Sequence, residues 1–336
     1  MVRPVDALAS AVDRLAEETR FSGVVAVDRG GTTSLRTAYG LADRRCGAPV
    51  TVGSQLPIAS GSKGLTALAV VSLIEEGRLE LSTRARVVLG SDLPLISDAV
   101  TVEHLLGHRS GIGDYLDEEA GGAVDDYVLA VPVHKLATTE QYLRVLDGHP
   151  PKFGPGERFS YCNGGYVVLA LIAERVAGQP FPELVEERVT GPAAMRDTAF
   201  LRSDELPARA AIGYLGSEGL RTNVLHLPVV GSGDGGIYTT ASDVHALWDA
   251  LFAGRIVSPE WVARMVHPHS EAESMRYGLG FWLHPSGDAV VLEGSDAGVS
   301  FRSVHDPVRR VTHTVLSNTS TGAWPVARLL DELLAG

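Results

Sequence analysis

The sequence predicts an α+β fold: an antiparallel sheet flanked by helices from both chain ends, with a mostly helical domain inserted. Two observations carry this prediction. Strand-like runs occur near the start of the chain and return beyond residue 231, and amphipathic helical segments mark both ends. Between them, helical pieces alternate with loops rich in Gly, Pro and Asp. We expect a discontinuous sheet domain over 1–75 and 233–336, a helical domain over 76–232 and an active-site cleft between them.

The first elements follow from apolar periodicity. Apolar side chains at helical spacing predict an amphipathic helix at the start, and they are Val5, Leu8, Ala9, Val12, Leu15 and Ala16. The run FSGVVAV (21–27) predicts a buried strand, DRGG a turn and TTSLRTAYG (32–40) its hairpin partner. From Leu65 to Ile74 apolar side chains cover nearly the whole circumference, which predicts a helix buried on all sides, with Gly77 ending it in a left-handed cap.

The later elements are predicted from residues typical of helix ends and from the alternation of apolar and polar residues in strands. Thr101 before VEH is typical of a helix N-cap, and Gly178-Gln179-Pro180 of a helix stop. Strands are predicted for GGIYTT (235–240), YGLGFWL (277–283), DAVVLEG (288–294), VSFRSVH (299–305) and RVTHTVLSN (310–318). The last segment is again amphipathic, with Val326, Leu329, Leu330, Leu333 and Leu334 on its apolar face.

Composition narrows the class of protein. The 336 residues are enough for a large core, and 45% are hydrophobic and 21% charged, as is ordinary for a soluble protein. A net charge of −12 without a cluster of Lys and Arg argues against a nucleic-acid partner. Neither a signal peptide nor a membrane-spanning run is recognisable, and two cysteines, Cys46 and Cys162, do not make a disulfide framework. We therefore expect a cytoplasmic, reduced protein without a membrane partner.

The stretch ASGSKG (59–64) places a serine and a lysine three residues apart, just before the apolar helix. If Ser60 starts that helix, Lys63 lies on the same face and its amine can reach the hydroxyl. A serine becomes a nucleophile when a neighbouring base takes its proton, and a lysine with a lowered pKa can be that base. The helix N-terminus also favours developing negative charge. The alternative is that Ser60 is only an N-cap and that Lys63 is solvated.

A second polar cluster lies in FGPGERFSYCNGG, where Tyr161 and Asn163 occupy a short loop before an apolar helix. A tyrosine beside an ammonium group can lose its proton more easily and shuttle it. An asparagine offers both a donor and an acceptor for orienting a substrate. The alternative is a half-buried tyrosine beside a turn-forming asparagine. We interpret Cys162 as a small buried spacer.

Other candidate motifs carry less chemistry. His104 and His108 are four residues apart on a helix without the glutamate of a zinc motif, so we assign them packing and hydrogen-bonding roles. His267-Pro268-His269 lies in a loop without acidic or cysteine neighbours at ligand spacing. The segment GSGDGG (231–236) lacks phosphate-loop spacing and is interpreted as a tight turn near the cleft. No Gly-x-Ser-x-Gly elbow supports an α/β-hydrolase.

Taken together, the motifs resemble those of the serine β-lactamase and penicillin-binding-protein superfamily, especially its class C-like branch. That branch includes D,D-peptidases, D-aminopeptidases, family VIII esterases and some acyltransferases. The resemblance covers nearly the whole chain, through FSGVVAVDRGG, YGLADRRCGAPVT, LPIASGSKGLTALAVVSLIEEGRLEL, TVEHLLGHRSGIGDY, FGPGERFSYCNGGYVVLALIAERVAG, GDGGIYTTASDV, YGLGFW and EGSDAGVSF in that order. Ser-x-x-Lys alone is a weak signal, whereas the ordered set is a strong one. The resemblance implies the β-lactamase/transpeptidase-like fold.

The resemblance also implies roles for individual residues. Ser60 is expected to be the acylated nucleophile and Lys63 its proton acceptor. Tyr161 is expected to relay the proton to the leaving group, and Asn163 to position Lys63 or the substrate. The oxyanion hole is expected to use the backbone N–H groups of Ser60 and Ser295. The glutamate that serves as a base in class A relatives has no identifiable counterpart.

The third motif of the family is where this sequence departs. Relatives carry Lys-Thr-Gly, His-Thr-Gly or a close variant, whereas alignment on Gly298 puts Leu292-Glu293-Gly294 here. Gly294 still lets a substrate approach the strand, and Glu293 would favour a substrate ammonium if it points into the cleft. The departure argues against recognition of a substrate carboxylate. Gly61 and Gly64 stand where relatives carry larger residues, which predicts open space beside Ser60.

These observations predict a serine hydrolase that forms an acyl-enzyme on Ser60 from an ester, amide or lactam of a small molecule or short peptide. We expect no metal or organic cofactor, and the oligomeric state is not predicted. One alternative is an acyltransferase of a biosynthetic pathway, in which another acceptor replaces water. The other is a non-catalytic binding protein that retains the fold, which the loss of the third motif motivates.

Overall fold

The chain is organised around an antiparallel sheet that joins its two ends. The computed structural model describes residues 4–272 and 274–334. Within these residues the main sheet has eight strands in the order β2-β1-β13-β12-β11-β10-β9-β8. The strands are β1 (Gly23–Arg29), β2 (Thr32–Tyr39), β8 (Ser270–Glu271), β9 (Arg276–Tyr277), β10 (Trp282–Leu283), β11 (Val290–Asp296), β12 (Val299–Asp306) and β13 (Val311–Ser317). Because β1 pairs with β13 along its whole length, the predicted sheet built from both chain ends is confirmed.

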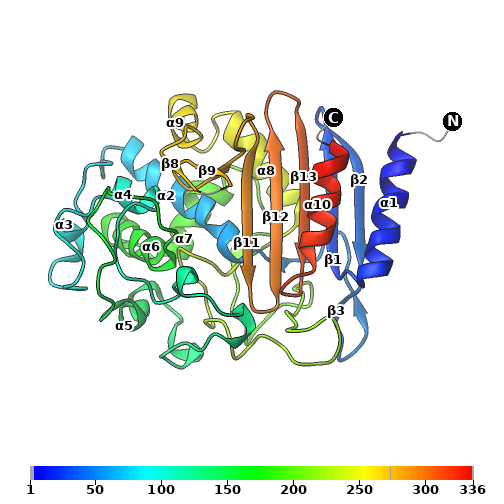
Figure 1. Cartoon of the computed structure of the whole chain (residues 1–336), viewed down its shortest axis with the longest axis horizontal. Helices are drawn as coiled ribbons and strands as arrows, with labels where there is room; N and C mark the ends of the chain where they lie inside the picture. Colours follow the sequence, from blue (N-terminus) through cyan, green and yellow to red (C-terminus); the bar gives the residue numbers. More distant parts are fainter. Residues whose placement is uncertain (1–3, 273, 335–336) are drawn as a thin grey trace.

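Two terminal helices cover one face of this sheet. Helices α1 (Pro4–Thr19) and α10 (Ala323–Leu334) lie side by side over β2, β1, β13 and β12 (Figure 1). Strand β1 shows why two cores form, because its side chains alternate between faces. Val25 and Val27 pack in the cluster with the terminal helices, whereas Val24 and Ala26 belong to the larger core on the other side.

The larger core is centred on helix α2 (Ser62–Glu75), which packs against α6 (Asn163–Ala177). Every residue of α2 from Ser62 to Leu73 is buried, as the apolar circumference predicts. Gly77 ends the helix with φ of 73°, the left-handed conformation that glycine adopts without strain.

The remaining helices are α3 (Ala85–Leu89), α4 (Val102–Leu106), α5 (Leu143–Leu146), α7 (Phe181–Val185), α8 (Ala241–Phe252) and α9 (Pro259–Met265). Of these, α3, α4 and α7 pack against α6, whereas α8 packs against β1 and β13 with α9 beside it. Single turns are formed by Ala59–Gly61, Glu118–Ala120, Val124–Asp126, Val133–Lys135, Thr139–Tyr142 and Glu186–Thr190. Thr101 accepts a hydrogen bond from the His104 N–H as the predicted N-cap, and Gly178 ends α6 in the left-handed conformation. Domain boundaries at 75/76 and 232/233 stay a prediction.

The predicted strand GGIYTT is confirmed, whereas YGLGFWL is not one continuous strand. GGIYTT contributes β7 (Ile237–Thr239) to a small separate sheet with β5 (Leu56–Pro57) and β6 (Ala199–Phe200). YGLGFWL is broken into β9 and β10, because the chain turns at Gly280 with φ of 93°. A Cβ at Gly280 would lie 2.2 Å from Ala67 Cβ, so the close approach of α2 requires the glycine. A further pair of short strands is β3 (Leu41–Asp43) with β4 (Ala48–Pro49).

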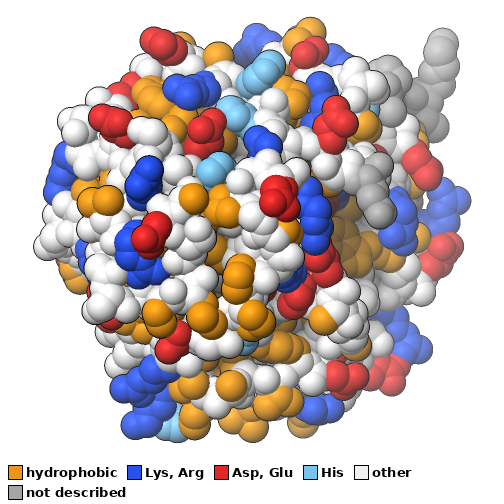
Figure 2. Space-filling view, turned by 60° about the vertical axis from the view of Figure 1, so that its left-hand side comes forward, with side chains coloured by type: hydrophobic (Ala, Val, Ile, Leu, Met, Phe, Trp, Pro, Cys, Tyr) orange, Lys and Arg blue, Asp and Glu red, His pale blue; other side chains and the backbone are white. Residues whose placement is uncertain are grey.

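One face of the molecule is shown in Figure 2. In the view of Figure 2, Lys and Arg side chains are scattered among acidic and apolar ones. Of the helices described between residues 4 and 334, none combines the length and apolar character needed to cross a bilayer.

Candidate active site

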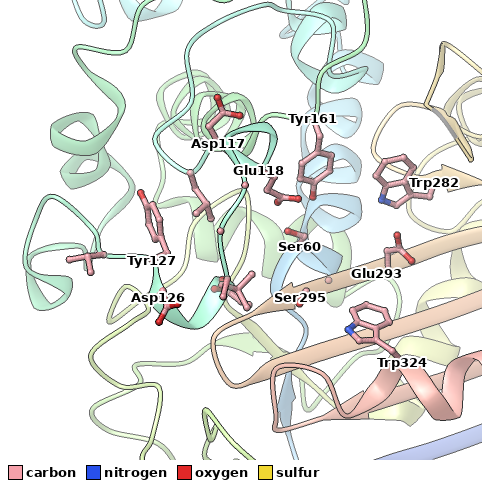
Figure 3. A pocket seen from close by; sticks show the side chains of 18 residues that line it. Ser60, Asp117, Glu118, Asp126, Tyr127, Tyr161, Trp282, Glu293, Ser295 and Trp324 are labelled. Atoms are coloured by element: carbon pink, nitrogen blue, oxygen red, sulfur yellow. The ribbon is translucent and has the colours of Figure 1, made fainter.

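A cleft of about 780 Å³ opens beside the start of α2. Its walls come from the turn that carries Ser60, the loop 116–128 and strand β11, with Tyr161, Trp282 and Trp324 at the sides. Figure 3 shows Tyr161 and Glu118 on the side of Ser60 opposite to β11, which carries Glu293 and Ser295. The residues predicted from separate motifs therefore meet in one cleft.

Ser60 lies in the single turn Ala59–Gly61 that leads into α2. The N-cap residues of this turn and of α2 are Ile58 and Gly61, so the interpretation of Ser60 as a mere N-cap is wrong. Instead, Lys63 Nζ donates a hydrogen bond to Ser60 Oγ at 2.9 Å, across the i, i+3 spacing. The preceding residue, Ala59, has φ of 42°, a conformation that is unfavourable for a residue with a side chain and that sets the position of Ser60.

Lys63 is a buried amine with defined partners, not the solvated side chain of the alternative interpretation. Its side chain is 2% exposed, and Nζ also donates to Asn163 Oδ1 at 2.8 Å and to the Asp234 carbonyl oxygen at 3.0 Å. Burial lowers the pKa of Lys63, because the charged form loses its hydration, while the carboxylates of Asp234 and Glu118 act in the opposite direction. The lowered pKa makes the neutral, proton-accepting form easier to reach.

Tyr161 completes the group around the serine. Its hydroxyl is hydrogen-bonded to Ser60, and its ring centroid lies 4.8 Å from Lys63 Nζ. Trp282 stacks on the ring at a centroid distance of 5.8 Å, with 12° between the planes. Burial raises the pKa of Tyr161 well above 10, so the proximity of the ammonium does not make this hydroxyl easier to deprotonate. Tyr161 therefore stays protonated and is suited to donate its proton.

Asn163 is held from three sides at the start of α6. Its Nδ2 donates to the Leu116 carbonyl oxygen at 2.9 Å and to Glu118 Oε1 at 3.1 Å. Its backbone N–H donates to Asp114 Oδ2 at 2.6 Å, and the Gly164 N–H donates to Asp114 Oδ1 at 2.8 Å. Because both amide hydrogens of the side chain are engaged, Oδ1 is left to face Lys63.

Strand β11 forms the opposite wall of the cleft. A Cβ at Gly294 would lie 2.4 Å from the Ile58 carbonyl oxygen and 2.6 Å from Ser60 N, so only glycine fits against the nucleophile turn. Strand β10 pairs with β11 only at Val290 and Val291, which leaves the edge of β11 beyond these residues without a partner from β10. Ser295 lies on this stretch and lines the cleft with Ser60. The oxyanion-hole assignment for their N–H groups stays a prediction.

Glu293 lines the cleft, but its charge already has a partner. Its carboxylate pairs with Arg302, which lies directly opposite on β12 and also pairs with Asp331 of α10 at 3.3 Å. The predicted open space beside Ser60 is absent. A Cβ at Gly61 would lie 2.4 Å from the Phe301 ring, and one at Gly64 would lie 2.6 Å from Leu292, because these side chains fill the room that the glycines leave.

The structure adds four acidic residues that sequence reasoning missed. Asp114, Glu118, Asp234 and Asp296 lie close enough to Lys63 to raise its pKa. Burial raises the pKa of Asp114 to about 6 and that of Asp296 to about 7, and the pKa of Asp234 is raised by the same cause. In the sequence the three aspartates lie among Gly and Ser residues, where an aspartate resembles a turn former, and Glu118 lies in the acidic run DEE (117–119). No local signal distinguishes them.

A second, smaller cavity continues inward from the nucleophile. Its volume is about 70 Å³, and aromatic and aliphatic side chains make up much of its wall. Six residues line both the cleft and this inner cavity, and they are Ser60, Leu116, Glu118, Tyr127, Ser295 and Asp296. Ser60 therefore stands at the junction of an outer and an inner space.

Comparison with known proteins is consistent with this geometry. Residues 8–335 match the family described as Beta-lactamase. Esterase EstB of Burkholderia gladioli is 35% identical over 60% of this chain and 52% of its own length, and a D-aminopeptidase of Brucella anthropi is 28% identical over 94% of this chain and 59% of its own. The chain thus spans about half to three fifths of these curated relatives.

A solved structure extends the likeness to the whole chain. The penicillin-binding protein from Bacillus halodurans is 33% identical and superposes with a TM-score of 0.90 over 96% of this chain and 99% of its own. The predicted β-lactamase/transpeptidase-like fold is therefore confirmed. With a family match over nearly every residue and a structural match of this quality, the chain belongs to the beta-lactamase family.

Proposed function

We propose that this protein is a serine hydrolase in which Ser60 attacks an ester, amide or lactam carbonyl and forms an acyl-enzyme. The observation that carries the proposal is the 2.9 Å hydrogen bond between a buried amine, Lys63 Nζ, and Ser60 Oγ. An amine buried in this way is a base matched to a serine hydroxyl. Esterase and D-aminopeptidase relatives support a hydrolase.

The geometry supports a balanced acylation step. Neutral Lys63 takes the Ser60 hydroxyl proton while Oγ bonds to the substrate carbonyl carbon, and the N–H groups of Ser60 and Ser295 stabilise the oxyanion. The tetrahedral intermediate collapses as Tyr161 gives its hydroxyl proton to the leaving oxygen or nitrogen. The proton held by Lys63 then returns to Tyr161. Water repeats the sequence in reverse roles to release the acid and regenerate Ser60.

The charge of the cleft favours some substrates over others. Acidic residues line the two cavities, and they are Asp117, Glu118, Asp126, Asp234, Glu293 and Asp296, whereas none of the described lining residues is Lys or Arg. Because Glu293 is already paired with Arg302, the other carboxylates are the ones that disfavour a substrate carboxylate and favour an amino group near the scissile bond by charge-assisted hydrogen bonding. Small-molecule esters and amides, or short peptides with a free amino group, are the substrates we propose.

Two alternatives lead to different outcomes in one experiment. An acyltransferase would pass the Ser60 acyl group to an added amine or alcohol in preference to water, which product analysis detects. A non-catalytic binding protein would take up no acyl group at all. We prefer the hydrolase, because Ser60, Lys63, Tyr161 and Asn163 are all present and connected, which simple retention of the fold does not require.

The test is intact-mass analysis after treatment with a fluorophosphonate, combined with ester and amide hydrolysis assays. The wild-type chain should gain one adduct, mapped to Ser60, and Ser60→Ala should gain none and lose hydrolysis. The matched control is Ser62→Ala, because the Ser62 hydroxyl is fully buried and accepts a structural hydrogen bond from the Ile237 N–H at 3.3 Å. Wild-type hydrolysis by Ser60→Ala would overturn the proposal.

A further inference from the structure

His108 lies just beyond helix α4 and contacts the loop that carries Tyr161. It is 1% exposed and has φ of 53°. Its backbone carbonyl oxygen accepts a hydrogen bond from the Ser160 N–H at 2.9 Å, and its ring Nδ1 accepts one from the Cys162 N–H at 3.0 Å. One residue thus binds the peptide groups of both immediate neighbours of Tyr161.

The His108 ring also touches the tyrosine directly. Its centroid lies 4.4 Å from that of Tyr161, and Trp282 stacks on the same tyrosine ring at 5.8 Å. Tyr166 and Tyr277 pack against the imidazole at 4.9 and 4.8 Å, so the imidazole itself has little freedom to move. Both the backbone and the ring of Tyr161 are therefore constrained through His108.

The hydrogen bonds determine which form of His108 is present. Nδ1 can accept from Cys162 only if it carries no proton, so the proton of the neutral ring resides on Nε2. Nε2 is buried and has no hydrogen-bond partner among the residues that the structure describes, an arrangement that is costly in a folded protein. Burial and the nearby Lys63 charge both lower the pKa of His108, which keeps the ring neutral. The unpaired Nε2–H is explained if the site requires Nδ1 to be the acceptor, because the neutral ring must then carry its proton on Nε2.

We propose that His108 is a positioning residue that holds the Tyr161 hydroxyl at Ser60, through its hydrogen bond to Cys162 and its contact with the tyrosine ring. This inference rests on the proposed function, because the step at issue is proton donation from Tyr161 to the leaving group. A misplaced Tyr161 slows reactions that need this proton. It affects much less a substrate whose leaving group departs as a stable anion.

Leaving-group dependence separates positioning from a general structural effect. We would measure kcat/KM on an alkyl ester and a p-nitrophenyl ester for the wild type, Tyr161→Phe, His108→Asn and His108→Gly. Asparagine and glycine both tolerate the positive φ, but only asparagine keeps a side-chain acceptor near the Cys162 N–H. We expect His108→Gly to lose at least about tenfold more on the alkyl ester than on the activated one, as Tyr161→Phe should, since acid–base catalysis typically contributes 10²–10⁴-fold. His108→Asn should recover most of this difference. His267→Asn, an exposed histidine, is the matched control.

Each outcome decides the inference. Equal losses on both esters, or indistinguishable Asn and Gly variants, would overturn it. If both variants fail to fold, the ¹⁵N shifts of His108 in the wild type decide, because a proton on Nδ1 at pH 7 contradicts the role and a proton on Nε2 alone supports it. Ser60→Ala distinguishes failure of the proposed hydrolase function from failure of the positioning role of His108. Retained hydrolysis in that variant refutes the proposed function, whereas its loss together with an unchanged His108 series refutes only this inference.

Discussion

Gly294 of β11 lies directly against Ser60 of the nucleophile turn, and a Cβ at Gly294 would fall 2.6 Å from Ser60 N. At this point the sheet and the turn that carries the serine therefore meet through backbone atoms. This contact brings the part of β11 that β10 does not cover beside the nucleophile, where the proposed reaction would place the substrate carbonyl oxygen.

Adding one methyl group at Gly294 should separate these elements. Because the nearest atoms are backbone, Gly294→Ala should cost about 1–3 kcal/mol in the free energy of unfolding, and kcat/KM should fall by more than about tenfold. Urea denaturation and ester hydrolysis measure the two effects. Gly53→Ala is the control, because its nearest contact would be Arg209 Nη2 at 3.5 Å. Full activity in Gly294→Ala would contradict the close contact.

Lys63 should govern the acidic limb of the pH profile. Its pKa is lowered from the ordinary value of 10.5 by burial, and the neutral form is the base. The value of kcat/KM should therefore rise with pH through a midpoint below 10.5. Lys63→Met should abolish this limb and reduce kcat/KM by about 10²–10⁴-fold. The exposed Lys135→Met serves as control, and a profile unchanged by Lys63→Met would assign the limb to another group.

Asp296 should make the protein less stable as pH rises. Its folded-state pKa of about 7 lies above the ordinary value of 3.8, so between these values the folded state binds more protons than the unfolded one. The free energy of unfolding should fall from about pH 4 to pH 7 and then level off. The total fall should be on the order of a few kcal/mol, because each pKa unit corresponds to about 1.4 kcal/mol. Asp296→Asn should remove the part of this decline that Asp296 causes, while Asp114 and Asp234, whose pKa values are also raised, keep their own part. Urea unfolding at pH 5 and pH 8 tests this. A wild-type protein that is more stable at pH 8 than at pH 5 would have the opposite sign and would refute the prediction.

Glu118 should discriminate substrates by charge. It lines both cavities beside Ser60, and the only side-chain hydrogen bond described for it comes from Asn163 Nδ2 at 3.1 Å. Glu118→Gln should raise KM for an amino-acid amide about tenfold more than for an uncharged analogue of the same shape, because only the former loses a charge-assisted hydrogen bond. The control is Glu17→Gln, at an exposed position of α1, which should leave KM for both substrates unchanged. Equal changes for the two substrates would argue against an ammonium site.

The sequence by itself determined the features that depend on neighbours along the chain. The contact of Ser60 with Lys63 follows from the i, i+3 geometry of a helix start, and the left-handed cap at Gly77 from the freedom of glycine. The sheet strands and terminal helices followed from periodicity, and the family from the order of motifs. YGLGFWL was predicted as one strand where the structure has two short ones, because the alternation of side chains does not reveal the turn at Gly280.

Only the tertiary structure decided the electrostatics of the site. Lys63 meets Asn163 and Asp234 across 100 and 171 residues of sequence, and burial, not the neighbouring ammonium, sets the protonation of Tyr161. The partner of Glu293 is Arg302, which the register of β11 and β12 places opposite it. Phe301 and Leu292 fill the space beside Gly61 and Gly64. Desolvation and long-range packing depend on which distant segments come into contact, and a local sequence pattern does not encode those contacts.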